Sequence, residues 1–346
     1  MRVLLTGAGG FIGSHVTEHI LTKTDWHLVG TDSFRHKGRC DRIARILAEA
    51  PENSGWHERL TVITHDLAAP FTGGEIGRIG TLDVVIAMAS QSHVDRSLAD
   101  PVPFVRNNTD VILNTLELCR QVKPRLVIVI STDEVYGPTV PGQAHKEWAP
   151  IIPSNPYSAS KAAQEAIAIS YWRAYGVPVV IVNCMNLFGE MQDPEKYVPM
   201  TIGKVQRGEI VRVYGQPGDI GTRHYLHARN LADALVFLIE RGRPSAFPTP
   251  QNVGLDTAML PDRYNIAGPN PVSNLDLASM IANIVGKPLN HKLVDFHSAR
   301  PGHDPHYGLD PSKLMGMGWA PPVDFETSLE KTVLWSLKHP EWLVEE

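Results

Sequence analysis

The chain has 346 residues, of which 43% are hydrophobic and 20% are charged, and its formal net charge at pH 7 is -5. This length suffices for one large α/β domain or two smaller ones, and the mild acidity excludes the basic surface that holds a nucleic-acid backbone. No apolar stretch approaches the ~18 residues that cross a bilayer, and the apolar start is too short for a signal peptide, so we expect a cytoplasmic protein without a membrane partner.

Short apolar runs alternate with stretches of helical spacing through the first half of the chain. The predicted strands are residues 2–7, 27–32, 61–66, 83–90, 125–132 and 178–184. Helical spacing or end signals predict helices over 11–23, 101–121, 155–175 and 231–241. Near-continuous apolar strands separated by helices indicate an α/β fold with a parallel sheet covered on both faces.

The stretch "GAGGFIG" lies between the first predicted strand and the first predicted helix. It places three glycines, Gly7, Gly10 and Gly13, where the backbone must approach a ligand closely. Amides at a helix N-terminus bind a pyrophosphate, so this turn predicts a dinucleotide site. Asp32 ends the next strand, 25 residues after Gly7, where a carboxylate can bind the adenosine ribose.

Asp32 also repels a 2′-phosphate, which favours NAD over NADP. Arg35, three residues later, is the feature that opposes this choice. Asp66 ends the third predicted strand in "THDL" and suits either the adenine amino group or a simple cap of the strand end. NAD is therefore the expected cofactor.

Two adjacent carboxylic acids, Asp133 and Glu134, follow the apolar run 125–130 in "STDEVYG". A solvated loop is one interpretation. The other is a catalytic pair, because mutual repulsion and burial push two apparent pKa values apart and leave one acid and one base at the same pH.

Tyr157 and Lys161 stand four residues apart near the start of a predicted helix that Asn155 can cap and Gly176 can end. Four-residue spacing places both side chains on one helix face. Such a pair is common on ordinary helices. A lysine ammonium beside the phenol, together with a nicotinamide cation, could supply the ~4 kcal/mol that brings the tyrosine pKa towards neutrality.

The combination and order of these motifs resemble the extended short-chain dehydrogenase/reductase family and, within it, the nucleotide-sugar 4,6-dehydratases, which carry the same "TDE" sequence. Further matching stretches are "SQSHVDRS", "NPYSASKA", "NCMNLFG", "DPEKYVPM", "YNIAG" and "RPGHDPHYGLDPSKL". The resemblance implies a homodimer and a Rossmann domain with a smaller C-terminal α/β substrate domain. We expect residues 1–182 and 223–266 in the NAD-binding domain, and 183–222 and 267–346 in the nucleotide-sugar domain.

The resemblance also implies catalytic roles. Tyr157, with Lys161, would take the proton of the sugar O4 while NAD accepts hydride from C4, and Thr132 would hydrogen-bond O4. Glu134 would remove the C5 proton, and Asp133 would protonate the leaving C6 hydroxyl. The product would be a 4-keto-6-deoxy sugar nucleotide, from a donor of the dTDP-glucose or UDP-glucose type.

Binding residues are expected for both ligands. The NAD site would comprise Gly7, Gly10, Phe11, Ile12, Gly13, Asp32, Asp66, Leu67, Ala89, Ser90, Asn107, Tyr157 and Lys161. The nucleotide-sugar site would comprise Ser92, Asn186, Lys196, Arg223, Asn265 and Arg300. For the cations among the latter, a surface salt bridge is the alternative.

Some positions depart from the family pattern. Leu187, Phe188 and Glu190 stand where the family has Asn, Tyr and Pro, and "RHYLHARN" replaces "RDWLYVED". These departures lie in the predicted substrate half, so they leave the sugar and the base open. Two stretches, 36–58 and 241–262, look like surface insertions without evident chemistry.

No metal site is expected. The spacing of His297, His303 and His306 fits no usual ligand set, and the three cysteines, Cys40, Cys119 and Cys184, are too far apart for a zinc motif or a disulfide framework.

Two other kinds of function stay open. A nucleotide-sugar 4-epimerase or a UDP-glucuronate decarboxylase shares fold, cofactor and tyrosine, but an epimerase needs no C6 acid and a decarboxylase should lack Asp133 in that role. A non-catalytic NAD sensor on the same fold would tend to lose Tyr157 or Lys161, and both are present.

Overall fold

The computed structural model describes the whole chain except residues 141, 242–259, 296–303, 305 and 345–346. The predicted insertion 241–262 therefore lies almost entirely outside the described residues, as do Arg300, His297 and His303. Within the described part, no helix is both long and apolar enough to cross a membrane.

A parallel sheet of seven strands forms the centre of the molecule, with the order β12-β6-β5-β4-β1-β2-β3. Its strands are β1 (Arg2–Thr6), β2 (His27–Asp32), β3 (Leu60–Thr64), β4 (Val84–Ala87), β5 (Leu126–Thr132), β6 (Val179–Cys184) and β12 (Asp262–Ile266). The six strands predicted from the apolar runs are confirmed. The sequence did not predict β12.

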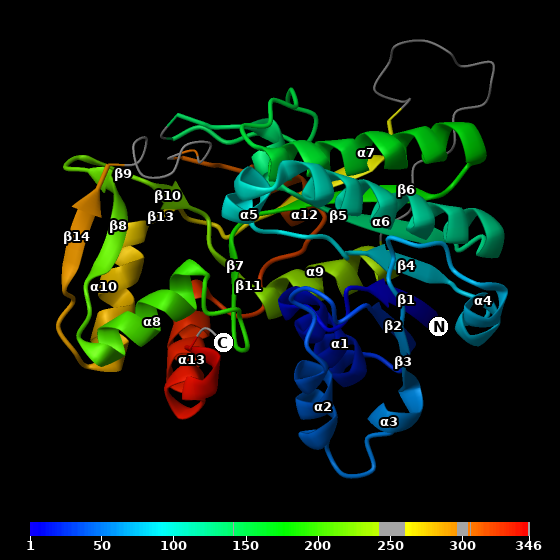
Figure 1. Cartoon of the computed structure of the whole chain (residues 1–346), viewed down its shortest axis with the longest axis horizontal. Helices are drawn as coiled ribbons and strands as arrows, with labels where there is room; N and C mark the ends of the chain where they lie inside the picture. The colour runs from blue at the N-terminus through cyan, green and yellow to red at the C-terminus, as the bar shows by residue number, and fades with distance from the viewer. Residues whose placement is uncertain (141, 242–259, 296–303, 305, 345–346) are drawn as a thin grey trace.

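Helices cover both faces of this sheet, as expected for buried parallel strands (Figure 1). One face carries α6 (Pro101–Val122) and α7 (Pro156–Tyr175), which pack side by side; the other carries α1 (Phe11–Lys23) and α9 (Ala228–Arg241). Asn155 caps α7 through the Ser158 amide, and Gly176 ends it at a φ of +69°. The doubly wound Rossmann-type fold is confirmed.

The chain also forms a second group of elements beside the sheet, at the left of Figure 1. Its helices are α8 (Tyr197–Arg207), α10 (Asn274–Val285) and α13 (Phe325–Lys338), which pack together, and its sheet contains β8 (Val211–Gln216), β9 (Asp219–Ile220) and β14 (His291–Val294). Short pairs join β10 (Thr222–Arg223) to β13 (Val272–Ser273) and β11 (Leu226–His227) to β7 (Leu187–Phe188).

The remaining helices are short. They are α2 (Cys40–Ala48), α3 (Trp56–Arg59), α4 (Gly73–Ile79), α5 (Val94–Ala99), α12 (Ser312–Gly316) and the 3-10 helices η1 (Asp133–Tyr136) and η3 (Pro340–Trp342). In the stretch 36–58, most side chains are at least partly exposed, but α2 buries Arg42, Ile43 and Ile46, and α3 buries Trp56.

Candidate active site

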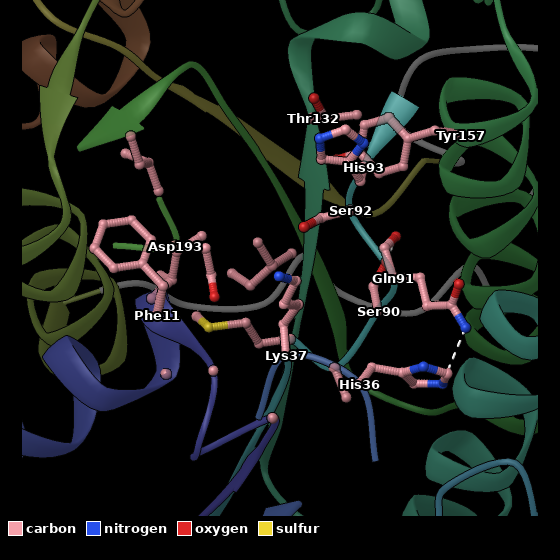
Figure 2. A pocket seen from close by; sticks show the side chains of 18 of the residues that line it. Phe11, His36, Lys37, Ser90, Gln91, Ser92, His93, Thr132, Tyr157 and Asp193 are labelled. Atoms are coloured by element: carbon pink, nitrogen blue, oxygen red, sulfur yellow. Dashed lines mark hydrogen bonds between the residues drawn. The ribbon is translucent and has the colours of Figure 1, made fainter. Parts of the chain in front are cut away.

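A deep cleft opens where the carboxyl ends of the sheet strands face the second group of elements (Figure 2). Parallel α/β sheets bind ligands at this edge, where neighbouring strands run to opposite sides. Here that switch lies between β1 and β4, which are adjacent in the sheet. In Figure 2, Phe11 and Asp193 form one wall, and Thr132, His93 and Tyr157 gather at the opposite end.

Every residue predicted for the cofactor lines this cleft. They are Gly7, Gly10, Phe11, Ile12, Gly13, Asp32, Asp66, Leu67, Ala89, Ser90, Asn107, Tyr157 and Lys161. The structure thus brings together residues from several strand ends and from the helices on both faces of the sheet.

The glycine turn fits a dinucleotide. Gly7 has a φ of +77°, and a Cβ there would lie 3.1 Å from the Ala89 Cα, so a side chain would intrude on the turn. A Cβ on Gly13 would lie only 2.0 Å from the Gly7 carbonyl oxygen, so α1 can approach β1 only without a side chain at this position. The first residues of α1 and the glycine before it line the cleft, so the N-terminus of this helix borders it, as a pyrophosphate requires.

The Asp32 carboxylate lies at the end of β2, buried beside the turn. Its two oxygens accept hydrogen bonds from the amides of Gly9 and Phe34, each at 2.9 Å. Burial raises the pKa of Asp32, while those amides and Arg42 lower it. Each oxygen keeps lone pairs for ribose hydroxyls, so the placement suits a ribose.

Arg35 lies at the outer end of the same site and is paired. Its guanidinium contacts the Asp66 carboxylate at 2.6 Å and donates to the Asn107 side-chain oxygen at 2.8 Å. Both partners of the ion pair are partly exposed. The cation that opposed NAD in the sequence is thus held by two residues predicted to bind this cofactor.

The acid pair lies where β5 passes into η1. Asp133 is buried, and one of its oxygens accepts a hydrogen bond from the Thr132 hydroxyl at 2.9 Å. Its second oxygen, Oδ2, is buried without a hydrogen-bond partner among the described residues. Burial, and then the neighbouring Glu134, raise the pKa of Asp133 to about 7.

Glu134 is partly buried beside it. Burial raises its pKa, whereas a hydrogen bond from the Asn155 amide, at 3.3 Å, and the charge of Arg223 lower it. The two carboxyls differ in surroundings, and both hold protons more tightly than in water. Such a pair can present an acid and a base together near neutral pH.

Tyr157 projects from the first turn of α7 and lies near Thr132 (Figure 2). Burial and the charge of Glu134 raise its pKa well above the ordinary value, and a hydrogen bond with Thr132 opposes this. Lys161 is buried too, and its ammonium donates to the Ile130 carbonyl and the Gln164 side chain. Burial lowers the pKa of Lys161 to about 8.

The expected lowering of the Tyr157 pKa depends on Lys161 and a nicotinamide cation acting together, and the protein's own contacts show only the contribution of Lys161. The ammonium of Lys161 is bound to other oxygens, and the pKa of Tyr157 is raised rather than brought towards neutrality. Lys161 alone therefore does not activate the phenol in this arrangement.

The residues predicted for the sugar nucleotide do not all reach the cleft. Ser92, Asn186 and Lys196 line it, and the Lys196 ammonium donates to the Ser92 carbonyl at 3.3 Å. Arg223 is buried nearby, over the Tyr307 ring, and lowers the pKa of both acids.

Asn265 lies elsewhere. It is completely buried in β12, where its amide donates to the His145 carbonyl at 2.9 Å and its oxygen lies 3.4 Å from the Tyr136 hydroxyl. This position gives it no access to the cleft, and we leave it out of the candidate site.

The structure adds three residues that the sequence did not single out. The His93 ring stands in the cleft, and the Glu195 carboxylate lies across it, bound to Lys37 and Arg96 at 2.9 Å each. Burial lowers the pKa of His93 to about 4, so its ring is neutral. Tyr307 lies near the acid pair and donates to the Asp304 carboxylate at 2.9 Å. All three lie in stretches that resemble the family, and this resemblance could have identified them from the sequence.

No metal site emerges from the described residues, in which no group of three or more His, Cys, Asp or Glu side chains could hold an ion. His306 instead contacts the Asp219 carboxylate at 2.9 Å and the Thr222 hydroxyl at 3.0 Å.

Comparison with known sequences gives matches over nearly the whole chain. Residues 4–332 match the family model described as GDP-mannose 4,6 dehydratase. A dTDP-glucose 4,6-dehydratase of Escherichia coli is 30% identical over 373 residues, covering 99% of this chain and 95% of that protein. A probable dTDP-glucose 4,6-dehydratase of Sinorhizobium fredii is 31% identical over 357 residues, covering 99% and 94%.

Solved structures agree. The dTDP-glucose 4,6-dehydratase DesIV of Streptomyces venezuelae, with NAD bound, superposes with a TM-score of 0.83 at 27% identity, covering 99% of this chain and 98% of that one. The UDP-glucose 4-epimerase of Thermus thermophilus, in complex with NAD, gives 0.79 at 28% identity, covering 97% and 98%. The fold is therefore shared by dehydratases and epimerases, and only the contents of the cleft can separate them.

Proposed function

Because this chain belongs to the GDP-mannose 4,6 dehydratase family, we propose that it is an NAD-dependent nucleotide-sugar 4,6-dehydratase. It removes water from a nucleoside-diphosphate hexose and yields the 4-keto-6-deoxy sugar nucleotide. The observation that carries this reaction is the adjacent acid pair, Asp133 and Glu134, buried next to Thr132 and Tyr157 in the NAD cleft.

The glycine turn and Asp32 would hold the pyrophosphate and ribose of NAD. When bound, NAD would supply hydride transfer from C4 and back to C6, while Glu134 returns the proton to C5, so the overall reaction would consume no oxidant. Lys161, fixed by two hydrogen bonds, orients the helix face that carries Tyr157.

The remaining steps move protons. Tyr157 takes the O4 proton, assisted by the Thr132 hydroxyl and by the positive charge that the oxidised nicotinamide adds nearby. Oxidation at C4 acidifies the C5 hydrogen, which Glu134 removes as a base. Asp133 donates its proton to the departing C6 hydroxyl, which leaves as water. The Oδ2 atom of Asp133 has no hydrogen-bond partner among the described residues, which supports this role because a protonated carboxyl can donate there.

On the substrate side, Lys196 and Arg223 are the cations proposed for the diphosphate, with Ser92 and Asn186 adding hydrogen bonds. Arg300 stays in the proposal on the strength of the sequence alone. A 4-epimerase is the second candidate, since solved 4-epimerases share the fold. An epimerase would not use Asp133 and Glu134, because its reaction needs no acid at C6.

Mass spectrometry after incubation with dTDP-glucose, UDP-glucose, UDP-GlcNAc, GDP-mannose and CDP-glucose tests the proposal. Loss of one water from one donor, over many turnovers and without added NAD, is the expected result. Epimerisation with no change in mass supports the second candidate. Binding without turnover of any donor supports the sensor.

We further propose the domain division 1–182 with 223–266 and 183–222 with 267–346, a homodimer, and a cytoplasmic location. The exposed side chains of Leu98 and Val102, on α5 and at the start of α6, support a partner surface there. Light scattering of the purified protein tests the dimer, and cell fractionation tests the location.

A further inference from the structure

Helix α2 belongs to the stretch 36–58, which the proposed mechanism does not use, yet it contributes a completely buried arginine. Arg42 has 0% of its side chain exposed. Because a guanidinium stays charged in proteins, burial is costly unless hydrogen bonds and an opposite charge compensate. The carboxylate that pairs with it is Asp193, at 3.2 Å.

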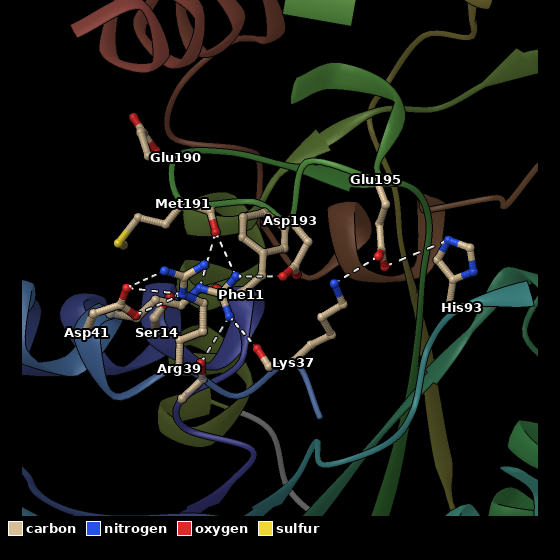
Figure 3. A network of polar contacts seen from close by, with 12 residues as sticks. Phe11, Ser14, Lys37, Arg39, Asp41, His93, Glu190, Met191, Asp193 and Glu195 are labelled. Atoms are coloured by element: carbon tan, nitrogen blue, oxygen red, sulfur yellow. Dashed lines mark hydrogen bonds and ion pairs between the residues drawn. The ribbon is translucent and has the colours of Figure 1, made fainter. Parts of the chain in front are cut away.

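The hydrogen bonds of Arg42 join three separate segments. Its Nη1 donates to the Gly9 carbonyl at 3.1 Å, in the glycine turn, and to the Lys37 carbonyl at 2.7 Å, in the loop after β2. Its Nε and Nη2 both donate to the Met191 carbonyl, at 3.2 and 2.9 Å. Figure 3 shows Met191 and Asp193 on one side of this network and Lys37 on the other.

The third segment, residues 189–196, forms the substrate-side wall of the cleft. Gln192, Asp193, Glu195 and Lys196 all line it. Met191 has a φ of +59°, a backbone conformation that a side-chain-bearing residue adopts at a cost, and Arg42 binds its carbonyl twice. A second link, between Lys37 and Glu195 at 2.9 Å, crosses the mouth of the cleft (Figure 3).

A planar guanidinium suits this task, because its fixed fork of donors constrains several acceptors at once. Any shift of the Gly9 carbonyl changes where Arg42 can sit, and Arg42 in turn holds Met191 and Asp193. The glycine turn and the 189–196 segment therefore cannot adjust independently. One ligand lies against each of them in the proposed function.

We propose that Arg42 is a positioning residue that couples the dinucleotide site to the nucleotide-sugar site, so that a bound nucleoside diphosphate and NAD each strengthen the binding of the other. The proposal rests on the proposed function for the identity of both ligands. Coupling is reciprocal by thermodynamic necessity, and factors of roughly 5–150 are typical. It can thus be measured from either ligand.

The test uses the purified holoenzyme loaded with radiolabelled NAD. Release of the label into excess unlabelled NAD is timed with no addition and with saturating dTDP, UDP, GDP or CDP. In the wild type, we expect one of these nucleotides to slow release about tenfold. In Arg42→Met, the slowing should shrink to less than about twofold.

Arg45→Met is the matched control. Arg45 lies one turn further along α2 and stacks on Trp335 of the C-terminal region at 4.9 Å, but its polar side-chain partners, His339 and Glu49, lie outside the cleft. This variant should keep the tenfold effect. Arg42→Lys serves if Arg42→Met does not fold, since a single ammonium keeps the charge but cannot span Gly9 and Met191 together; it should retain less than half of the effect.

Two results overturn the proposal. One is a wild type in which none of the four nucleoside diphosphates alters NAD release. The other is an Arg42 variant whose slowing equals that of Arg45→Met. Dehydration of a donor sugar by the wild type is measured separately, so loss of the coupling with intact turnover refutes this inference alone, and failure of all donors refutes the proposed function.

Discussion

Two buried carboxylates lie on either side of the cleft wall and behave in opposite ways. Asp133 is 4% exposed and Glu190 is 5% exposed. Burial and Glu134 raise the pKa of Asp133 to about 7. Burial also raises the pKa of Glu190, but a hydrogen bond and charge from His227, with Arg229, outweigh it and hold that pKa well below its usual range.

The two pKa values differ because of hydrogen-bond and charge partners, since the two side chains are similarly buried. Glu190 accepts from the His227 ring at 3.0 Å and lies 3.4 Å from Arg229, while its backbone carbonyl accepts from His15 at 2.9 Å. Asp133 has an acid as its neighbour and an oxygen without a partner among the described residues. An anchoring carboxylate is fully paired, whereas a carboxylate that must exchange protons is left incompletely paired.

The largest effects are expected when the incompletely paired acids are replaced. Asp133→Asn and Glu134→Gln should each lower kcat for dehydration by about 10²–10⁴-fold, because each removes one proton-transfer group. Turnover is measured as loss of water by mass spectrometry. The Glu134→Gln variant should also lose exchange of the C5 hydrogen with solvent deuterium.

Retained NAD is the control for these variants, since neither residue belongs to the proposed cofactor site. Dehydration at the original rate in both variants would contradict the assignment of the acid and base roles to this pair.

The second prediction concerns pH. A proton donor must be protonated, and the pKa of Asp133 is raised to about 7, so activity should persist below that pH and decline above it. If this single group controls the basic limb, kcat/KM should fall about fiftyfold between pH 7 and 9. The check is the dependence of kcat/KM on pH for the residual activity of Asp133→Asn, which should not decline above pH 7. An unchanged decline in that variant would assign the titration to another group.

The sequence could group the residues that we propose to be catalytic because they are local. Thr132, Asp133 and Glu134 are consecutive at a strand end, and Tyr157 and Lys161 share one helix face. The six apolar strands were predictable for the same reason, since near-continuous apolar runs mark buried parallel strands.

What the sequence could not show depends on distant polar partners. Strand β12 was missed because its Arg263 and Asn265 look like surface residues. Both are fully buried, and Arg263 pairs with the buried Glu165 at 2.6 Å. Likewise, Glu190, His227 and Arg229, which depart from the family pattern, form ion pairs with one another outside the cleft lining. They therefore do not by themselves alter the sugar site.

The fully paired carboxylate, Glu190, should contribute to stability rather than to catalysis. Glu190→Gln should lower the free energy of unfolding by about 2 kcal/mol, because it removes the charge from a buried hydrogen bond and ion pair. Urea unfolding measures this loss, and kcat should stay within about twofold of the wild type.

The sign of its pH dependence is fixed. The folded-state pKa of Glu190 lies below the ordinary 4.5, so its contribution is present above pH 4.5 and is lost as the pH falls towards the folded-state pKa. The difference between wild type and variant should therefore shrink below pH 4.5. A strong loss of turnover with unchanged stability would instead place Glu190 in the catalytic machinery.

The exposed ion pair between Arg35 and Asp66 should contribute less to stability than the buried pairs of Glu190. Arg35 and Asp66 form an ion pair at 2.6 Å, shorter than any contact of Glu190, but their side chains are 48% and 39% exposed. Exposed pairs contribute ~1 kcal/mol or less, since solvent screens the charges and both side chains lose freedom. Arg35→Gln should accordingly change the unfolding free energy by under about 1 kcal/mol, even though it deletes the charge as Glu190→Gln does. An effect as large as that of Glu190→Gln would show that contact distance, and not burial with complete pairing, determines how strongly a charge pair stabilises this fold.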